Sequence, residues 1–199
     1  MGRLLRLGIL AALGMIPSGA QVIEFEQNGL KYQTLTRGDI TVMFAHMPQH
    51  LKNYSMMHVA IANGSKLPCA VRPEDFSYVR GDQPVPATSA TGIVKMLMDR
   101  GEHDDVVKLT LAYESVLYGF NRMKVTNGYE LRRQNFMSYG GSTRVRAAAE
   151  ASAIVLVATK LKPGESTDGA VFFRNDAKTL SGGHITFRAN GEVFVFNGD

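Results

Sequence analysis

The sequence predicts an α+β fold in which a helical segment interrupts an antiparallel β-sandwich between its two halves. Short segments of alternating polarity lie at both ends of the chain, and segments of helical periodicity lie between them. The links between the first strands are too short for crossover helices, which favours antiparallel pairing. With 199 residues, 45% hydrophobic and 20% charged, the chain suits one globular domain and lacks the bias of a coiled coil, collagen or a disordered chain.

The first 20 residues predict a secretory signal peptide. Arg3 and Arg6 precede an apolar run from Leu7 to Ile16, and Ser18-Gly19-Ala20 supplies the small residues of a cleavage site. The run, of about ten residues, is too short to span about 30 Å of hydrocarbon. We expect cleavage after Ala20 and an exported chain of residues 21–199, periplasmic or extracellular, without a transmembrane segment. An uncleaved anchor is the alternative.

Four strands are expected in the first half. Residues 30–35 alternate in polarity, and Arg37-Gly38-Asp39 turns the chain into a second strand over 40–47. A third strand covers 55–63, with Met57, Val59 and Ile61 on one face and His58 on the other, where it is exposed or packed on the sheet. A fourth covers 70–80, and its prolines predict an edge or bulged strand.

The middle of the chain predicts a helical insert at about 86–158 within the single domain 21–199. Ser89 or Thr91 can cap a helix over 92–100, and further helices are expected over 104–118 and 127–139. An alanine-rich helix begins at Ser142 or Thr143. Its end near 154–160 stays open, because the aliphatic run there suits either a last helical turn or a strand.

Strand patterns return at 169–174, 184–188 and 192–196, and Asn190-Gly191 predicts a tight hairpin between the last two. Adjacent strand residues point to opposite faces. Val171 and Phe173 are therefore expected to face the core. Phe172 is expected to face outward, covered by the helical insert or by a partner.

Two sequence patterns carry a family resemblance. Residues 59–63, Val-Ala-Ile-Ala-Asn, precede Pro73-Glu74-Asp75-Phe76, and residues 161–165, Leu-Lys-Pro-Gly-Glu, precede Gly169-Ala170-Val171-Phe172-Phe173. Both resemble exported bacterial immunoglobulin-like domains of unknown function. The resemblance covers roughly residues 30–80 and 160–197, and this chain departs from the simple form by its helices. It implies an immunoglobulin-like sandwich and an envelope or extracellular location, and it brings no catalytic residue.

The motifs predict no catalytic, cofactor-binding or metal-binding residue. His46 and His50 have helical ligand spacing, but Pro48 forbids a helix interior there, so two loop histidines are expected. The lone Cys69 is expected to be buried, and Asp104 and Asp105 to cap a helix. These observations favour a non-catalytic interaction module. The alternative is a hydrolase of cell-wall or other polymer with a site between sandwich and insert.

One basic cluster is a candidate binding surface for an unknown envelope protein or an anionic polymer. Residues 84–162 hold eleven Lys or Arg against seven Asp or Glu. Its possible partner-binding residues are Arg132, Arg133, Arg144 and Arg146, with Tyr129, Phe136 and Tyr139 as apolar anchors. A solvated helical face is the alternative. Loss of Arg3 and Arg6 lowers the net charge from +4 to +2, which argues against nucleic acid as a partner.

Overall fold

The computed structural model describes residues 21–27, 29–117, 141–175, 180 and 182–197. Strands in antiparallel sheets make up most of this part, together with three α-helices, so the expected α+β class is confirmed. The expected signal peptide, the expected helix over 127–139 and five candidate binding residues lie outside the described residues. Those five are Tyr129, Arg132, Arg133, Phe136 and Tyr139. No described helix is both long enough and apolar enough to cross a membrane.

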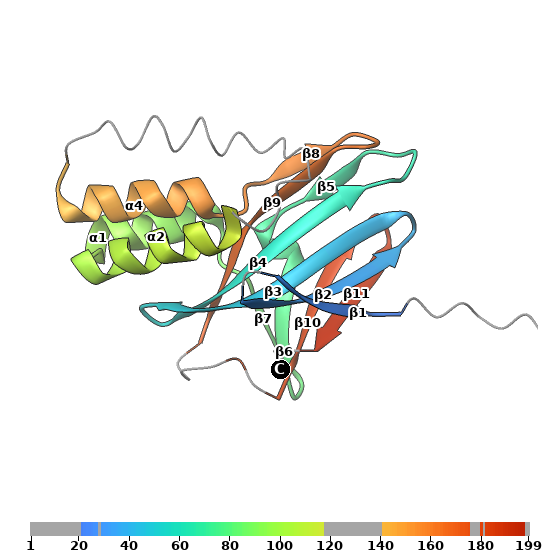
Figure 1. Ribbon diagram of the computed structural model, residues 1–199, viewed down its shortest axis with the longest axis horizontal. Helices are drawn as coiled ribbons and strands as arrows, with labels where there is room; N and C mark the ends of the chain where they lie inside the picture. The colour runs from blue at the N-terminus through green and yellow to red at the C-terminus, as the bar shows by residue number, and fades with distance from the viewer. Residues whose placement is uncertain (1–20, 28, 118–140, 176–179, 181, 198–199) are drawn as a thin grey trace, which may run out of the picture.

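The larger sheet has five strands in the order β1-β2-β3-β4-β9. They are β1 (Ile23–Gln27), β2 (Leu30–Arg37), β3 (Ile40–Leu51), β4 (Tyr54–Asn63) and β9 (Ser166–Arg174). Gly38 and Asp39 both take positive φ, at 51° and 60°, which gives the tight turn that the sequence predicts between β2 and β3. Strand β1 was not predicted, and it extends the sheet by one strand beyond β2 (Figure 1).

The second sheet has four strands in the order β11-β10-β6-β7. They are β11 (Glu192–Asn197), β10 (His184–Ala189), β6 (Phe76–Arg80) and β7 (Gln83–Pro86). The expected strand over 70–80 is divided: β5 (Cys69–Val71) pairs with β8 (Thr159–Leu161), a 3-10 turn follows, and β6 comes next. Because Pro73 lies in that turn, β6 keeps its hydrogen bonds on both sides. The expected edge position is therefore wrong for β6, which lies between β10 and β7.

Both ends of the chain contribute to both sheets. Strand β9 pairs with β4, and β10 pairs with β6, so late strands complete the early sheets as the sequence predicts for one sandwich. Four strands of the larger sheet follow one another in sequence. Immunoglobulin sheets instead take non-consecutive strands through Greek-key connections. The immunoglobulin-like assignment thus rests on the quoted sequence patterns and stays a prediction.

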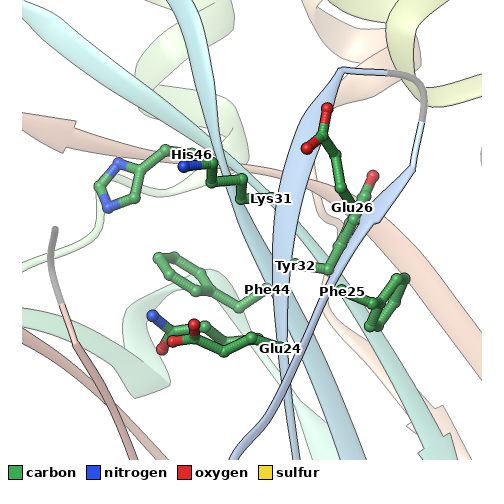
Figure 2. A pocket seen from close by; sticks show the side chains of 8 residues that line it. Glu24, Phe25, Glu26, Lys31, Tyr32, Phe44 and His46 are labelled. Atoms are coloured by element: carbon green, nitrogen blue, oxygen red, sulfur yellow. The ribbon is translucent and has the colours of Figure 1, made fainter.

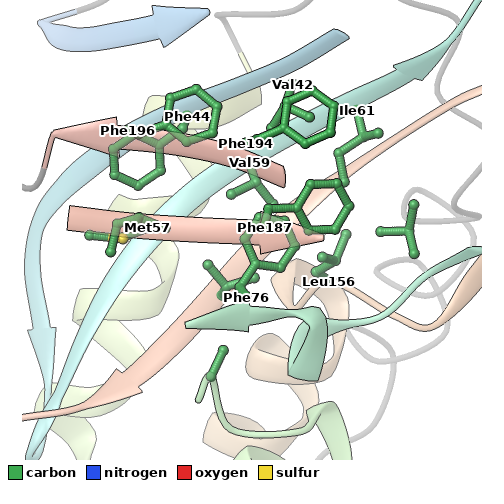
Figure 3. Close-up of a cluster of buried hydrophobic side chains, with 14 of the residues drawn as sticks. Val42, Phe44, Met57, Val59, Ile61, Phe76, Leu156, Phe187, Phe194 and Phe196 are labelled. Atoms are coloured by element: carbon green, nitrogen blue, oxygen red, sulfur yellow. The ribbon is translucent and has the colours of Figure 1, made fainter. Parts of the chain in front are cut away.

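An aromatic core fills the space between the two sheets (Figure 3). Phe76 and Phe187 stack with ring centroids 4.3 Å apart, and Phe194 lies 5.6 Å from Phe187. Phe44 of the larger sheet stacks on Phe196 at 5.5 Å. Phe173 belongs to this core and is fully buried, which confirms its predicted inward orientation.

Three helices cover the opposite face of the larger sheet: α1 (Ala90–Arg100), α2 (His103–Leu117) and α4 (Thr143–Ile154). They lie together on one side of it in Figure 1. The Gly92 backbone N–H donates to Ser89 Oγ at 3.1 Å, which is the expected cap of α1. Phe172 is fully buried against these helices, so its predicted cover is the helical layer.

The end of α4 is set by a close approach to β9. The helix stops at Ile154, Val155 forms a parallel bridge with Ala170, and Leu156 N donates to Ala170 O at 2.8 Å. A Cβ at Gly169 would lie 2.6 Å from Leu156 Cα. The chain after α4 is therefore extended, which decides the question that the sequence left open, and Gly169 leaves room for it.

Candidate functional site

The described part of the basic cluster lies in the first turn of α4. Arg144 and Arg146 are exposed there, and Arg146 Nε lies 3.6 Å from Glu150 Oε1. Glu150 Oε2 in turn accepts a hydrogen bond of 2.6 Å from the Thr110 hydroxyl. One of the two described arginines is thus partly neutralised within the helical layer.

The positive excess of the insert does not come from its described helices. Within α1, α2 and α4, five Lys or Arg face five Asp or Glu. Residues 118–140, outside the described residues, hold four Lys or Arg against one Glu. The structure therefore shows the positions of two of the seven candidate binding residues. Whether the other five lie near them stays a prediction.

The space between the larger sheet and the helices is filled by a second apolar core. Asp105 lies in the first turn of α2, with 2% of its surface exposed. Its carboxylate accepts a hydrogen bond of 2.8 Å from Glu102 N and forms an ion pair with Lys52 Nζ at 3.0 Å. This confirms the predicted capping role for Asp105 at the start of α2. Burial lowers the pKa of Lys52, but hydrogen bonds to Asp105 and Glu102 outweigh it and raise that pKa above its ordinary value.

A polar constellation that the sequence did not predict lies on the helix-facing side of the larger sheet. The Tyr32 hydroxyl is 3.4 Å from His58 Nδ1, and His58 Nε2 is 3.5 Å from Asp168 Oδ2. Tyr32 and His58 both pair with Ala45, one from each side. The small alanine leaves room for the two rings, whose centroids are 6.1 Å apart, to meet above it. No sequence spacing brings these residues together, because they come from β2, β4 and β9.

Burial governs the chemistry of this constellation. Tyr32 has 1% of its surface exposed and His58 none, and the Phe25 ring stacks on Tyr32 at 5.3 Å. Burial, and to a lesser degree the charge of Asp168, raises the pKa of Tyr32 to about 12. The phenol therefore keeps its proton at neutral pH.

A shallow cavity of about 360 Å³ lies at the β1 end of the larger sheet. Antiparallel partners share a face of the sheet, so Glu24 lies beside its partner Gln33, Glu26 lies beside Lys31, and Phe44 lies beside Gln33. The residues that line the cavity are Glu24, Phe25, Glu26, Lys31, Tyr32, Gln33, Phe44 and His46. Figure 2 shows Glu24, Lys31, Phe44 and His46 on one side of the β1–β2 hairpin and Phe25 on the other. The end of β11 borders the cavity, because Asn197 N donates to Gln33 Oε1 at 3.0 Å.

The remaining candidate chemistry resolves into structural roles. His46 and His50 lie in β3 on either side of an irregularity, not in a loop as expected, and His50 Nδ1 is 3.5 Å from Ser55 Oγ. Cys69 is buried as predicted, and burial followed by the charge of Asp75 raises the pKa of its thiol. In the described ranges, no three His, Cys, Asp or Glu side chains gather as metal ligands would.

Comparison with known proteins gives no match to a protein-family model, to a curated protein or to a solved structure.

Proposed function

We propose that this chain is an exported, non-catalytic interaction module of the bacterial envelope or exterior, with an immunoglobulin-like sandwich as its scaffold. The observation that carries the proposal is the way the helices meet the sheet. Their shared interface is an apolar core that includes Phe172, Met56 and Leu97, and the Lys52 ion pairs to α2 reinforce it. Helices packed on the sheet in this way leave their outer side as a fixed surface for a partner. A hydrolase site between sandwich and helices would instead need a cleft there.

The helical layer binds an acidic envelope protein or an anionic polymer through its basic residues. All four residues from Thr143 to Arg146 are exposed at the start of α4. Arg144 and Arg146 form the described part of this surface, which Arg132 and Arg133 would complete. Attraction between exposed charges is screened over about 8 Å at physiological salt, so the binding weakens as salt rises.

The test measures retention of the exported protein on immobilised polyglutamate across a salt series. The protein is purified from the periplasm or the medium, where an intact mass matching residues 21–199 checks the export and cleavage parts of the proposal. The variant replaces Arg132, Arg133, Arg144 and Arg146 with Gln. We expect it to elute at clearly lower salt than the wild type.

A matched control removes charge from the sandwich instead. Arg37, Arg80 and Arg188 are exposed on the sheets. Their replacement with Gln, together with Lys66→Gln, removes four positive charges, as many as in the helical variant. The control should elute at higher salt than the helical variant. Equal elution of the two variants would show that retention follows net charge alone, and the helical surface would be rejected.

A further inference from the structure

Strand β1 differs from β9 and β7, which also end the two main sheets. Strand β11 likewise pairs with one strand only, β10, but it alternates exposed valines with buried phenylalanines and has no acidic face. Backbone N–H groups of Thr88 and Leu156 donate to β9 and cover its outer side. Strand β7 carries Pro84 and Pro86, which lack the N–H that a further strand would need. Among the described residues, β1 pairs with β2 and with no other strand, and its five residues include no proline.

The two faces of β1 have opposite chemistry. Ile23 and Phe25 are exposed on one face, at 62% and 36%. Glu24 and Glu26 are exposed on the other face, where they line the cavity above Phe44 and His46. A strand with one apolar face and one acidic face, whose residues 23–26 pair with no described strand except β2, is a template for an added strand of complementary pattern.

We propose that β1 binds an extended segment of a partner protein by strand addition, and that this segment alternates basic and apolar residues. Its backbone pairs with the outer side of β1. Its Lys or Arg side chains point over the cavity toward Glu24 and Glu26, and its apolar side chains extend the Ile23 and Phe25 face. The surface is separate from the helical layer and prefers the opposite charge, so neither proposal depends on the other.

A second copy of this chain fits the edge less well. Antiparallel pairing of two β1 strands centred on Phe25 would place Glu24 of each copy opposite Glu26 of the other. Like charges directly opposite one another destabilise a strand pair. Charge complementarity therefore favours a basic segment from another protein.

The test titrates the isotopically labelled full chain with three synthetic peptides. One alternates Lys and Val, one alternates Glu and Val, and the third is the Lys and Val peptide N-methylated at alternate residues to remove the hydrogen-bond donors of one edge. We expect the first to bind with amide shift changes centred on Ile23–Gln27, and the other two to bind much more weakly. Equal binding of the N-methylated peptide would overturn strand addition, as would shift changes centred elsewhere.

Charge variants then test the assignment of the acidic face. Glu24→Gln plus Glu26→Gln should weaken the Lys and Val peptide about three- to tenfold, because each exposed ion pair contributes modestly. Glu24→Lys plus Glu26→Lys should reverse the preference toward the Glu and Val peptide. The control Glu74→Lys plus Asp82→Lys makes the same charge change at exposed positions outside β1, and should keep the wild-type preference. An unreversed preference in the β1 variant, with a wild-type thermal melt, would reject the proposal.

Sedimentation of the unbound chain tests whether a second copy of the chain occupies the β1 edge. A dimer that the Lys and Val peptide cannot dissociate, and that Phe25→Asp abolishes, would show that a second copy occupies the edge, and the peptide partner would be rejected. A monomer that binds the peptide supports it.

Discussion

The two faces of the five-stranded sheet are both buried along β4 and β9, but they are buried by different means. The face toward the second sheet is covered by large aromatic rings, including Phe76, Phe187 and Phe194. The core on the helix-facing side instead includes small residues of α4, which packs against α1 and α2; among them are Ala147, Ala148 and Ala151. Sheets pack about 10 Å apart and need long side chains to fill that gap, whereas alanines let the central helix lie close to its neighbours.

Adjacent residues of β9 show this difference directly. Phe173 enters the aromatic core and Phe172 enters the helical core, although one peptide bond separates them. The strand is therefore part of both layers. Damage to either face should therefore destabilise the whole domain.

Replacing Phe173 with Ala should lower the free energy of unfolding by about 3 to 5 kcal/mol, because a buried ring leaves a cavity. Phe172→Ala should cost a similar amount, since Phe172 is equally buried. Urea unfolding followed by circular dichroism measures both. Hydrogen exchange should distinguish them, with the protection of α1 and α4 falling first in Phe172→Ala.

The control is Val195→Ala, at a partly exposed position on the outer side of the second sheet, which should change stability by less than about 1 kcal/mol. A loss at Phe172 no larger than at Val195 would contradict the helical cover.

Tyr32, on the helix-facing side of the sheet, predicts that the stability of the domain falls at alkaline pH. Its folded pKa of about 12 exceeds the unfolded value of about 10. The contribution of Tyr32 to the free energy of unfolding is fully present below pH 10. It is lost as pH rises through the folded pKa. Between those limits the wild type should lose up to about 2 kcal/mol that Tyr32→Phe does not lose.

Urea unfolding at several alkaline pH values measures the difference between the two proteins. Tyr54→Phe, a partly exposed tyrosine on the same sheet, is the control and should follow the wild type. Parallel pH curves for wild type and Tyr32→Phe would show that Tyr32 does not resist ionisation.

The smallest expected effect concerns the attachment of α2 to the β3–β4 turn. Lys52→Met removes the ion pairs to Asp105 and Glu102, and should cost about 1 kcal/mol because Asp105 keeps its hydrogen bond from Glu102 N. Lys66→Met, at an exposed lysine, is the matched control. Thermal melts at low and high salt measure both. A melting temperature equal to that of the wild type for Lys52→Met at low salt would show that the Lys52 ion pairs do not help to attach α2.

Local patterns in the sequence determined most of the elements. Turn residues located the hairpins at Gly38-Asp39 and Asn190-Gly191, and helical periodicity with Ser89 as cap located α1. The alternation of Ile23 and Phe25 with Glu24 and Glu26 before Asn28-Gly29 also favours a hairpin, although no strand was predicted there. These features are readable because each depends on the few residues that surround it.

Which layers cover the sheet, and which polar groups meet, depends on contacts between residues far apart in sequence. Val171 and Phe173 could be assigned to one face from period-two alternation alone, but the cover over Phe172 depends on α1, α2 and α4. Tyr32, His58 and Asp168 meet because β2, β3, β4 and β9 pair in one register and because Ala45 is small. The cavity likewise requires β1 to pair with β2, because both strands line it. Such contacts join residues far apart in sequence, and strand pairing that no local pattern encodes sets their distances.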